Sequence, residues 1–540
     1  MKFFLPLRGI MKNTLYALLS GILLAAAWPT YGISFLLFFA FVPLLLAEYR
    51  IRMSQTRNKK WKVLLPAYIS FFIWNLITTY WLYYSTPFGG AFAVLVNSLL
   101  MSLVFLLYHI VASRVNFKAA ATFFISIWMV FEYLHLNWEF SWPWLNLGNG
   151  FSDSTQWIQW YEYTGTFGGT LWVLLTNIII LQTLLLFRQH RDKAILLRGG
   201  LRTILIIGIP ILVSFIILSN YVEGEEQIEV VVLQPNINPY TEKYHTTDAR
   251  IGLLLNDLAN EAITDTTQAV IAPETVFAGG TNLRRFDQSE AAFFTSEFVR
   301  MHPQINFISG VAMYDRFNDA SQVTSQSNQI GPSDWYNDYN SAFMVNANDS
   351  IMFYHKSKLV VGVENFPYQS VLKPILGDVM IDLGGTVAMK TMQDDRGVFE
   401  MLEGQEVGPI ICYESVYGEF VGGYVSNGAD FLAIITNDAW WDDTQGHQQH
   451  LSYAKFRAIE TRRSIARSAN TGISAFINEK GEILQTLAYE EQGALRGSVT
   501  LNDKITFYTK HGDYLARIAQ FLALFIFLFA VTKWRKGRVV

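Results

Sequence analysis

The sequence predicts a polytopic α-helical membrane bundle of about eight spans, joined to a separate α/β domain. Long apolar runs are confined to residues 1–220 and 515–534, whereas residues 221–513 have the composition of a soluble protein. Hydrophobic residues make up 51% of the 540 residues and charged residues only 16%, against roughly 25% charged in an ordinary soluble domain. This composition excludes a disordered chain and argues against a wholly soluble enzyme. The net charge of −4 gives no reason to expect a nucleic-acid partner.

The predicted membrane helices come from eight apolar runs, each near the ~20 residues that cross a bilayer. They lie at about 12–28, 32–48, 62–84, 89–112, 118–135, 165–187, 201–219 and 515–532. The first run has features of a signal peptide, since Lys2, Arg8 and Lys12 precede it and Ala25–Ala27 could serve as a cleavage site. Because further spans follow at once, we interpret this run as a retained anchor.

The basic residues predict the orientation of these spans. They occur near the N-terminus, in alternate loops and in the C-terminal tail, as Lys2, Arg8, Lys12, Arg50, Arg52, Arg57, Lys59, Lys60, Lys62, Arg114, Lys118, Arg188, Arg191, Lys193, Arg198, Arg202, Lys533, Arg535, Lys536 and Arg538. The remaining loops, at about 29–31, 85–88 and 136–164, contain no Lys or Arg. By the positive-inside rule both termini are expected in the cytoplasm, and residues 221–513 on the opposite side.

Three parts of the chain follow from this pattern. We expect a transmembrane bundle of about seven helices over 1–220 and an extracytoplasmic domain over 221–513. The last part, 514–540, is expected to be a membrane helix with a basic cytoplasmic tail. The loop at 136–164 is rich in aromatic side chains, including Trp138, Trp142, Trp144, Trp157, Trp160, Tyr161 and Tyr163. These rings suit either an aromatic belt at the lipid headgroups or a vestibule through which a lipid enters sideways.

Residues 221–513 alternate short β-rich runs with helical stretches, which is typical of a layered α/β domain. Strands are expected at 229–237, 268–274, 306–314, 341–346, 350–360, 408–414, 431–438 and 473–484, and helices at 250–263, 286–301 and 447–468. The stretch 455–467 carries Arg457, Arg462, Arg463 and Arg467. We interpret these four arginines as a mixture of structural pairs and a solvated face.

The single cysteine of the chain, Cys412, is a candidate nucleophile. It ends the apolar strand GPIICYE, where a turn into a helical stretch would expose a side chain at the sheet edge. A buried free cysteine that packs as a small hydrophobe is the alternative. A thiol also needs assistance to react, because its ordinary pKa is about 8.5.

Two other strand ends could supply that assistance. Glu274 closes the strand QAVIAPE, and Lys356 follows another β-run in YHKSKL. A carboxylate there could act as a general base, and a lysine could stabilise the oxyanion of a tetrahedral intermediate. Each charge taken alone is equally compatible with a surface or structural residue, so spacing by itself establishes no triad.

The ordered motifs PE at 273–274, YHKSKL at 354–359 and ICYE at 411–414 resemble the Glu–Lys–Cys arrangement of the nitrilase superfamily. A nitrilase-like αββα sandwich placed after seven spans and before one more is similar to the bacterial apolipoprotein N-acyltransferase family. The strand motif LQPNI at 233–237, NDAWW at 437–441 and the stretch 449–474 strengthen this resemblance, which covers essentially the whole chain.

The resemblance implies a role for each site residue. Cys412 would be the nucleophile, Glu274 the general base and Lys356 the stabiliser of the oxyanion. The supporting residues would be Glu364, the second carboxylate, together with Tyr413 and Glu414 beside the nucleophile. The family pattern after the lysine usually runs Lys-x-His-Leu, whereas here it is Lys356-Ser357-Lys358-Leu359. Lys358 therefore keeps a competing claim to the role of Lys356.

The resemblance also implies an activity: transfer of a fatty acyl chain from a membrane phospholipid, through a Cys412 thioester, to the N-terminal amine of a diacylglyceryl apolipoprotein. The expected location is the bacterial inner membrane, with the catalytic domain in the periplasm and the protein a monomer. Two alternatives stay open. One is a membrane-tethered nitrilase-type amidase that hydrolyses a C–N bond, and the other is a membrane protein whose outer domain only binds a partner.

His447 and His450, in HQQH, have a spacing that suits metal ligands. A third ligand cluster is missing from the sequence, and the family it resembles uses no metal. We therefore expect neither a metal nor another cofactor. The two histidines are expected to cap or pack the predicted helix at 447–468.

Overall fold

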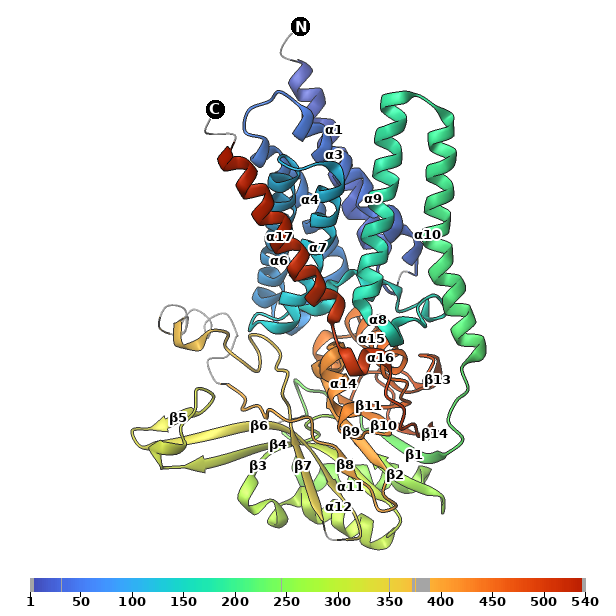
Figure 1. The fold of residues 1–540 in the computed structure, drawn as a ribbon. Helices are drawn as coiled ribbons and strands as arrows, with labels where there is room; N and C mark the ends of the chain where they lie inside the picture. The colour runs from blue at the N-terminus through green and yellow to red at the C-terminus, as the bar shows by residue number, and fades with distance from the viewer. Residues whose placement is uncertain are drawn as a thin grey trace. The chain divides into compact units, whose positions relative to one another are not determined.

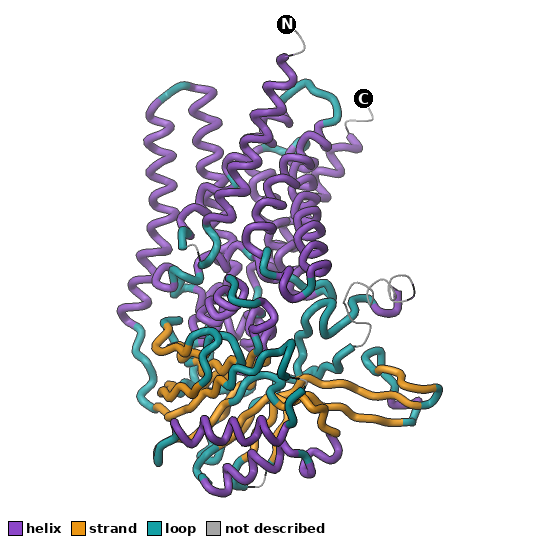
Figure 2. Tube along the Cα trace, turned by 180° about the vertical axis from the view of Figure 1, so that it is seen from behind, coloured by secondary structure: helices purple, strands orange, loops and turns teal. Residues whose placement is uncertain are grey.

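The computed structural model describes residues 4–30, 32–243, 245–348, 350–371, 374 and 389–536. Lys2 and Arg538, which entered the orientation argument, lie outside these residues. The chain divides into two compact units (Figures 1 and 2). Unit 1 comprises residues 1–83, 87–220 and 513–540, and unit 2 comprises residues 84–86 and 221–512.

Unit 1 is helical throughout its described residues (Figure 2). Its long helices are α1 (Phe4–Ala26), α3 (Val42–Met53), α4 (Lys59–Thr79), α6 (Pro87–Ala112), α7 (Phe117–Asn137), α9 (Thr166–His190), α10 (Lys193–Asn220) and α17 (Tyr514–Lys536). Shorter turns of helix are η1 (Ser34–Leu36), α2 (Leu37–Ala40), η2 (Pro143–Leu145), η3 (Leu147–Phe151), η4 (Thr155–Trp157) and α8 (Tyr161–Thr164), and α5 (Leu82–Ser85) lies between α4 and α6 in the sequence.

Seven of the eight expected spans are long and apolar enough to cross a membrane, among the residues that the structure describes. They are Ser34–Met53, Lys59–Thr79, Pro87–Ala112, Phe117–Asn137, Thr166–His190, Lys193–Asn220 and Tyr514–Lys533. The first expected span is the exception, because the apolar part of α1, Met11–Ala26, is shorter. At 1.5 Å per residue it extends only about 24 Å, less than a hydrocarbon core of about 30 Å.

The C-terminal helix α17 packs into the bundle through small residues. Ala523 and Ala530 of α17 are buried with Val111 of α6 and Phe123 of α7. One turn or more earlier, Ala516 and Ala519 are buried against α7 and α9. Small side chains at such spacing allow close approach of membrane helices. Helices from the two ends of the chain therefore share one core.

The aromatic loop at 136–164 folds into the short helices η2, η3, η4 and α8. Trp144 is fully buried, and Trp142 stacks on it with ring centroids 5.8 Å apart. Trp160 is also buried and meets Trp172 of α9 edge-on, at 5.6 Å. Trp144 and Trp160 thus belong to the core of unit 1 and not to an exposed belt or vestibule.

Unit 2 contains two sheets (Figure 1). The eight-stranded sheet has the order β14-β1-β2-β4-β6-β5, with β3 paired to β4 and β7 paired to β6. Its strands are β1 (Gln227–Gln234), β2 (Thr267–Ile271), β3 (Phe277–Asn282), β4 (Asn306–Phe317), β5 (Asn328–Gly331), β6 (Asp334–Val345), β7 (Ile351–His355) and β14 (Gly493–Thr500). The six-stranded sheet has the order β13-β12-β11-β10-β9-β8. Its strands are β8 (Phe399–Glu400), β9 (Glu406–Ile411), β10 (Phe431–Thr436), β11 (Ile465–Ala469), β12 (Ser474–Ile477) and β13 (Ile483–Leu487).

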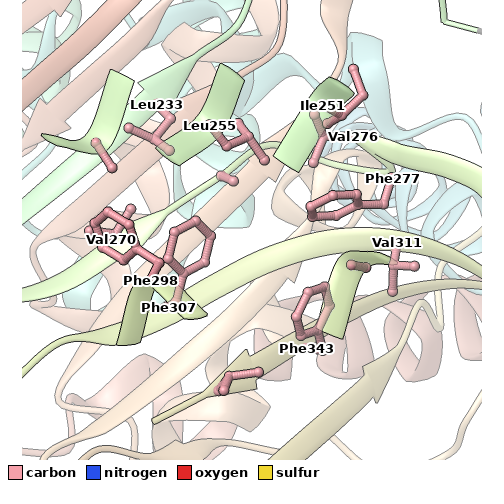
Figure 3. Packing of buried hydrophobic residues seen from close by; sticks show 14 of the residues in the cluster. Leu233, Ile251, Leu255, Val270, Val276, Phe277, Phe298, Phe307, Val311 and Phe343 are labelled. Atoms are coloured by element: carbon pink, nitrogen blue, oxygen red, sulfur yellow. The ribbon is translucent and has the colours of Figure 1, made fainter. Parts of the chain in front are cut away.

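The two sheets face each other, and helices cover their outer faces. The strand β1 contacts β11 across the interface. Helices α11 (Asp248–Ala262) and α12 (Glu290–Met301) pack on the first sheet, and α14 (Gly418–Ser426) packs on β9 and on α15 (Gln445–Thr461). Figure 3 shows the apolar core between the first sheet and its helices, where Leu233, Leu255 and Phe307 meet. The predicted αββα sandwich is confirmed.

The prediction of a helix over 447–468 is wrong in its last seven residues, about two turns. Helix α15 ends at Thr461, because Arg462 adopts a left-handed conformation with φ of 51° and reverses the chain. Residues Ile465–Ala469 then form β11, which is paired with β10 on one side and β12 on the other. The expected strand at 473–484 is likewise two strands, β12 and β13, joined by a turn at Gly481.

Candidate active site

Cys412 lies where β9 ends and the short helix η7 (Cys412–Val416) begins. Its φ is +51°, a left-handed conformation that L-residues seldom adopt. A strained strand-to-helix turn of this kind presents a nucleophile at a sheet edge. The hydroxyl of Ser415 donates a hydrogen bond to the Cys412 carbonyl oxygen at 2.7 Å. The cysteine is 7% exposed.

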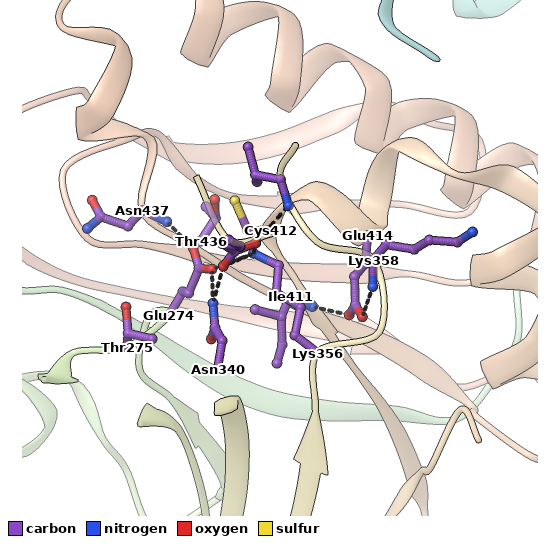
Figure 4. Close-up of polar contacts among 12 residues, drawn as sticks. Glu274, Thr275, Asn340, Lys356, Lys358, Ile411, Cys412, Glu414, Thr436 and Asn437 are labelled. Atoms are coloured by element: carbon purple, nitrogen blue, oxygen red, sulfur yellow. Dashed lines mark hydrogen bonds and ion pairs between the residues drawn. The ribbon is translucent and has the colours of Figure 1, made fainter. Parts of the chain in front are cut away.

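The fold brings Glu274 and Lys356 together beside this turn (Figure 4), and Glu364 pairs with the same lysine. Glu274 follows β2, and Lys356 follows β7 directly. The Lys356 ammonium lies 2.9 Å from the Glu274 carboxylate and 3.0 Å from that of Glu364. The Lys356 side chain is only 1% exposed, so this is a buried cation held between two carboxylates.

Asn340 and Asn437 complete the hydrogen bonds of this cluster. The Asn340 amide donates to Glu274 at 2.7 Å and to Glu364 at 2.9 Å, and the backbone N–H of Asn437 donates to Glu274 at 3.1 Å. Sequence reasoning missed Asn340. The signal available was a polar residue directly before the buried run SAFMVN at 341–346.

Burial and charge set the protonation of the three central groups. Burial, followed by the negative charge of Glu274, raises the pKa of the Cys412 thiol well above its ordinary value. Burial alone would raise the pKa of Glu274, but the Lys356 ammonium outweighs it and holds that pKa below its usual value. Burial opposes the charge of Lys356, yet Glu274 and Glu364 raise its pKa well above the usual range. In the resting site the thiol is therefore protonated and Glu274 is an ionised proton acceptor.

Glu414 links the lysine segment to the cysteine turn. Its carboxylate accepts hydrogen bonds from the Tyr354 hydroxyl at 2.7 Å and from the Tyr424 hydroxyl at 3.1 Å. It also accepts backbone N–H bonds from Ser357 at 2.6 Å and from Ile411 at 2.8 Å. One side chain thus joins the end of β7, the end of β9 and α14.

Of the two candidate lysines, Lys356 is the one that pairs with Glu274 and Glu364 in the described residues. The Lys358 ammonium lies over the rings of Tyr417 and Phe420, at 5.0 and 5.8 Å from their centroids. Its backbone N–H donates to Glu414 at 3.3 Å. Tyr413, the other predicted neighbour, is buried and packs edge-on against Tyr417 at 5.3 Å.

A glycine makes room for the Glu274 turn. The backbone N–H of Gly310 in β4 donates to the Pro273 carbonyl oxygen at 3.2 Å. A Cβ on Gly310 would stand 2.4 Å from the backbone nitrogen of Thr275, which is too close for any side chain. Thr275 itself has φ of +44°. The absence of a side chain at 310 therefore lets Glu274 reach Lys356.

The two histidines of HQQH are buried in α15 and have different partners. His447 lies 3.2 Å from the Asp443 carboxylate and stacks on Tyr489 at 4.4 Å. His450 lies 2.9 Å from the Asp438 carboxylate. Ligand atoms of Cys412, Asp438 and His450 lie within 4.8 Å of one another, which would suit a metal ion. Both nitrogens of His450 are already hydrogen-bonded, however.

The expectation of a partly solvated arginine face is wrong, because all four arginines are buried. Arg457 donates to the Val416 carbonyl oxygen at 2.9 Å and Arg462 to that of Glu479 at 3.0 Å. Arg463 donates to the carbonyl oxygen of Ala429 at 2.6 Å, and Arg467 donates to Asp438 at 2.6 Å. These guanidinium groups bind backbone carbonyls and two buried carboxylates, Asp438 and Glu460, so they support the site from within.

A buried cysteine on a strained turn, with a lysine between two carboxylates, defines a carbon–nitrogen hydrolase type of site. Residues 229–506 match the carbon–nitrogen hydrolase family model, and residues 20–179 match the apolipoprotein N-acyltransferase N-terminal domain. The chain belongs to the carbon–nitrogen hydrolase family, in its membrane-bound apolipoprotein N-acyltransferase branch. The predicted resemblance is confirmed.

Curated relatives align with nearly the whole chain. The apolipoprotein N-acyltransferase of Chlorobaculum tepidum is 27% identical over 98% of this chain and 98% of its own length. That of Geobacter metallireducens is 25% identical over 94% of this chain and 92% of its own. That of Thermotoga maritima is 25% identical over 96% and 93%. With seven apolar helices of spanning length in its described residues, the chain is a bacterial membrane protein.

Proposed function

We propose that this protein transfers a fatty acyl chain from a membrane phospholipid to the α-amine of a diacylglyceryl apolipoprotein. The observation that carries the proposal is the Lys356 ammonium, buried between Glu274 and Glu364 beside the Cys412 turn. The names of the full-length relatives support an apolipoprotein as the acyl acceptor, and the phospholipid donor is part of the proposal. Both proposed substrates are anchored in a bilayer, so the membrane helices would place the enzyme beside them. A soluble amidase would not need such helices.

In the first half-reaction Glu274 removes the thiol proton, and the Cys412 sulfur attacks the ester carbonyl carbon of the phospholipid. The carbonyl oxygen becomes an oxyanion, which the Lys356 ammonium stabilises. When the intermediate collapses, the ester C–O bond breaks and the lysophospholipid oxygen takes the proton from Glu274. The enzyme then carries a thioester on Cys412.

In the second half-reaction the α-amine of the lipid-modified cysteine attacks the thioester carbonyl. Glu274 takes a proton from the amine, and Lys356 again stabilises the oxyanion. The C–S bond breaks, an amide forms, and the proton on Glu274 returns to the departing sulfur. Because water would compete with the amine for the thioester, a buried thiol favours transfer over hydrolysis.

We further propose that the chain lies in the inner membrane as a monomer, with both termini in the cytoplasm. The bundle would comprise 1–220 and the final helix and tail 514–540, with 221–513 in the periplasm. The basic loops support this orientation through the positive-inside rule. It also places α1 across the membrane despite its short apolar part, because an even number of spans is needed.

Mass spectrometry of the intact detergent-purified protein tests the thioester. Wild type and Cys412→Ala are each mixed with phospholipid vesicles. We expect a mass increase of one fatty acyl chain in wild type alone, which hydroxylamine removes. Addition of a diacylglyceryl peptide should discharge the same adduct and add the acyl mass to the peptide.

The contrary outcome is equally specific. If phospholipid leaves no adduct while a small thiol reagent still labels Cys412, the thiol is accessible but the donor is wrong. A membrane-tethered amidase would then be the better assignment, and hydrolysis of small amides by wild type, lost in Cys412→Ala, would establish it. If Cys412→Ala keeps full activity in both assays, neither enzyme assignment holds.

A further inference from the structure

A second buried charged cluster lies on another side of the Cys412 turn. It consists of Asp438 in η8 (Asp438–Trp441), His450 in α15 and Arg467 in β11. All three are at most 1% exposed. Arg467 donates to one oxygen of Asp438 at 2.6 Å, and His450 Nδ1 lies 2.9 Å from the other. Asp438, His450 and Arg467 lie in motifs that support the family resemblance, but the proposed mechanism gives none of them a role.

The partner of His450 Nδ1 requires a proton on that nitrogen. Asp438 accepts hydrogen bonds from Arg467 and, at 2.8 Å, from the Thr436 hydroxyl, so it is an ionised acceptor with no proton to give. Burial raises the pKa of Asp438, but Arg467 and His450 together hold it below its usual range. An unprotonated Nδ1 could accept from Arg467, 3.2 Å away, but would then set its lone pair against the carboxylate oxygen at 2.9 Å.

The partners of His450 Nε2 require a proton there as well. This nitrogen lies 3.2 Å from the Cys412 carbonyl oxygen, which can only accept. It also lies 3.0 Å from the Ser415 hydroxyl oxygen. The single hydroxyl hydrogen of Ser415 is already directed to the Cys412 carbonyl at 2.7 Å. Both ring nitrogens therefore face acceptors, which only a doubly protonated ring satisfies.

We propose that His450 is an imidazolium, held by Asp438, that fixes the Cys412 turn and stabilises the Cys412 thiolate once Glu274 has taken its proton. This deepens the proposed function, since it rests on Cys412 as the nucleophile. A ring nitrogen of His450 lies within 4.8 Å of the cysteine sulfur. His450 touches no substrate in this scheme and is a positioning residue.

The charges around the sulfur show what such a cation would add. Glu274, Lys356 and Glu364 together carry one negative charge, and Glu274 disfavours a thiolate beside it, whereas the Lys243 ammonium acts in the opposite direction. The titratable groups against the His450 ring are Asp438 from η8, Arg467 from β11 and Cys412 from η7. With His450 protonated, this second cluster carries one positive charge and offsets the first. With His450 neutral, the cluster of Asp438, His450 and Arg467 carries no net charge.

Alkylation of Cys412 tests the proposal, because the chain contains a single cysteine. The rate of labelling by iodoacetamide is measured against pH in the full-length detergent-purified protein. His450→Gln keeps an N–H that can reach the Cys412 carbonyl but removes the charge. We expect its labelling midpoint to rise by about one pH unit, equivalent to about tenfold slower labelling well below the midpoint. His447 lies three residues before His450 and contacts Asp443 and Tyr489. His447→Gln is the control and should leave the pH midpoint of Cys412 labelling unchanged.

A midpoint in folded His450→Gln equal to that of wild type overturns the proposal. If that variant fails to fold, the wild type still decides. Deuterium exchange at the C2–H of each histidine, measured by peptide mass spectrometry, reports ring protonation. We expect the C2–H of His450 to exchange as that of a doubly protonated ring, and exchange typical of a neutral ring overturns the proposal. Failure of the proposed function looks different, since wild type would then form no phospholipid-derived adduct, or Cys412→Ala would retain acyl transfer, whatever the labelling shows.

Discussion

The two charged clusters beside Cys412 are built oppositely. Around Lys356 one cation lies between two carboxylates, and the second carboxylate, Glu364, remains 13% exposed. Around Asp438 one carboxylate lies between Arg467 and His450, all of them essentially inaccessible. Buried charges are tolerated only when they are paired and hydrogen-bonded. The partly open cluster is therefore suited to exchange protons with substrates, whereas the closed one is suited to hold the cysteine turn.

The largest effect is expected from removing Lys356, the cation at the centre of the first cluster. Lys356→Met keeps the length of the side chain but leaves Glu274 and Glu364 buried without an ammonium. Loss of one partner of a buried pair costs about 3–5 kcal/mol. Loss of an oxyanion donor lowers kcat by about 10²–10³. We expect a lower thermal midpoint in detergent and near-complete loss of acyl transfer.

A charge-conserving partner change separates these two effects. Glu364→Gln with Lys356→Met removes one of the stranded carboxylates, so part of the lost stability should return. Activity should not return with it, because no oxyanion donor has been restored. Recovery of turnover in the double variant would mean that Lys356 has only a structural role.

Lys243 is a third cation near the site, and it sharpens the comparison because, among the residues that the structure describes, it forms no ion pair with a carboxylate. It is 9% exposed, and its ammonium donates to the Thr275 hydroxyl at 2.6 Å. Burial lowers its pKa to about 8, although Glu274 opposes this. Below pH 8 the ammonium is charged in both the folded and the unfolded state. Between pH 8 and 10.5 the unfolded chain keeps the proton that the folded one has lost, so stability rises with pH.

Lys243→Met removes this titration. We expect the variant to be more stable than wild type at pH 7.5, with the difference in unfolding free energy shrinking by about 3 kcal/mol as pH rises from 8 to 10.5. Thermal melts of both proteins in the same detergent across this range measure it. Parallel stability curves over the whole range would contradict the argument.

Glu414 tests whether the lysine segment and the cysteine turn depend on each other. Glu414→Gln keeps the shape but replaces one acceptor oxygen by an amide donor. That donor must then face either the Ser357 N–H and the Tyr354 hydroxyl, or the Ile411 N–H and the Tyr424 hydroxyl. Each buried group left without its partner costs about 1–3 kcal/mol. We expect a stability loss of that order together with slower labelling of Cys412 by iodoacetamide.

Tyr424→Phe is the milder control for this effect. It removes one donor to Glu414 and leaves the carboxylate with its other partners. Its loss should be clearly smaller than that of Glu414→Gln. Equal losses would indicate that packing of α14, and not the acceptor, connects the two segments.

Sequence reasoning reached the first cluster and missed the second, and the reason is physical. Glu274, Lys356 and Cys412 each end a buried strand, and strand ends converge at one sheet edge, so motif order predicted their meeting. Asp438, His450 and Arg467 meet only because the chain reverses at Arg462 and returns as β11. A left-handed arginine carries no helix-breaking signal, so the sequence of that stretch reads as continuous helix.

The membrane part shows the same limit in another form. Hydropathy predicted the long helices well, because a run of about twenty apolar residues is long enough to cross a bilayer as a helix. It could not tell which aromatic rings face lipid. Trp144 packs against Trp81, which lies far before the loop in sequence, and Trp160 packs against Trp172 of the helix α9 that follows the loop.

The smallest expected effect separates the two lysines that the motif left in competition. Lys358→Met removes an ammonium that lies over the faces of Tyr417 and Phe420 but keeps the apolar stem against them. A cation–π contact of this kind contributes about 0.5–1 kcal/mol. Measured beside Lys356→Met under identical conditions, Lys358→Met should keep acyl transfer within a few-fold of wild type and lose about 1 kcal/mol or less of stability. If Lys358→Met instead abolished turnover while Lys356→Met retained it, the ammonium between Glu274 and Glu364 would be a structural ion pair, and the oxyanion would have to be stabilised from the aromatic side of the site.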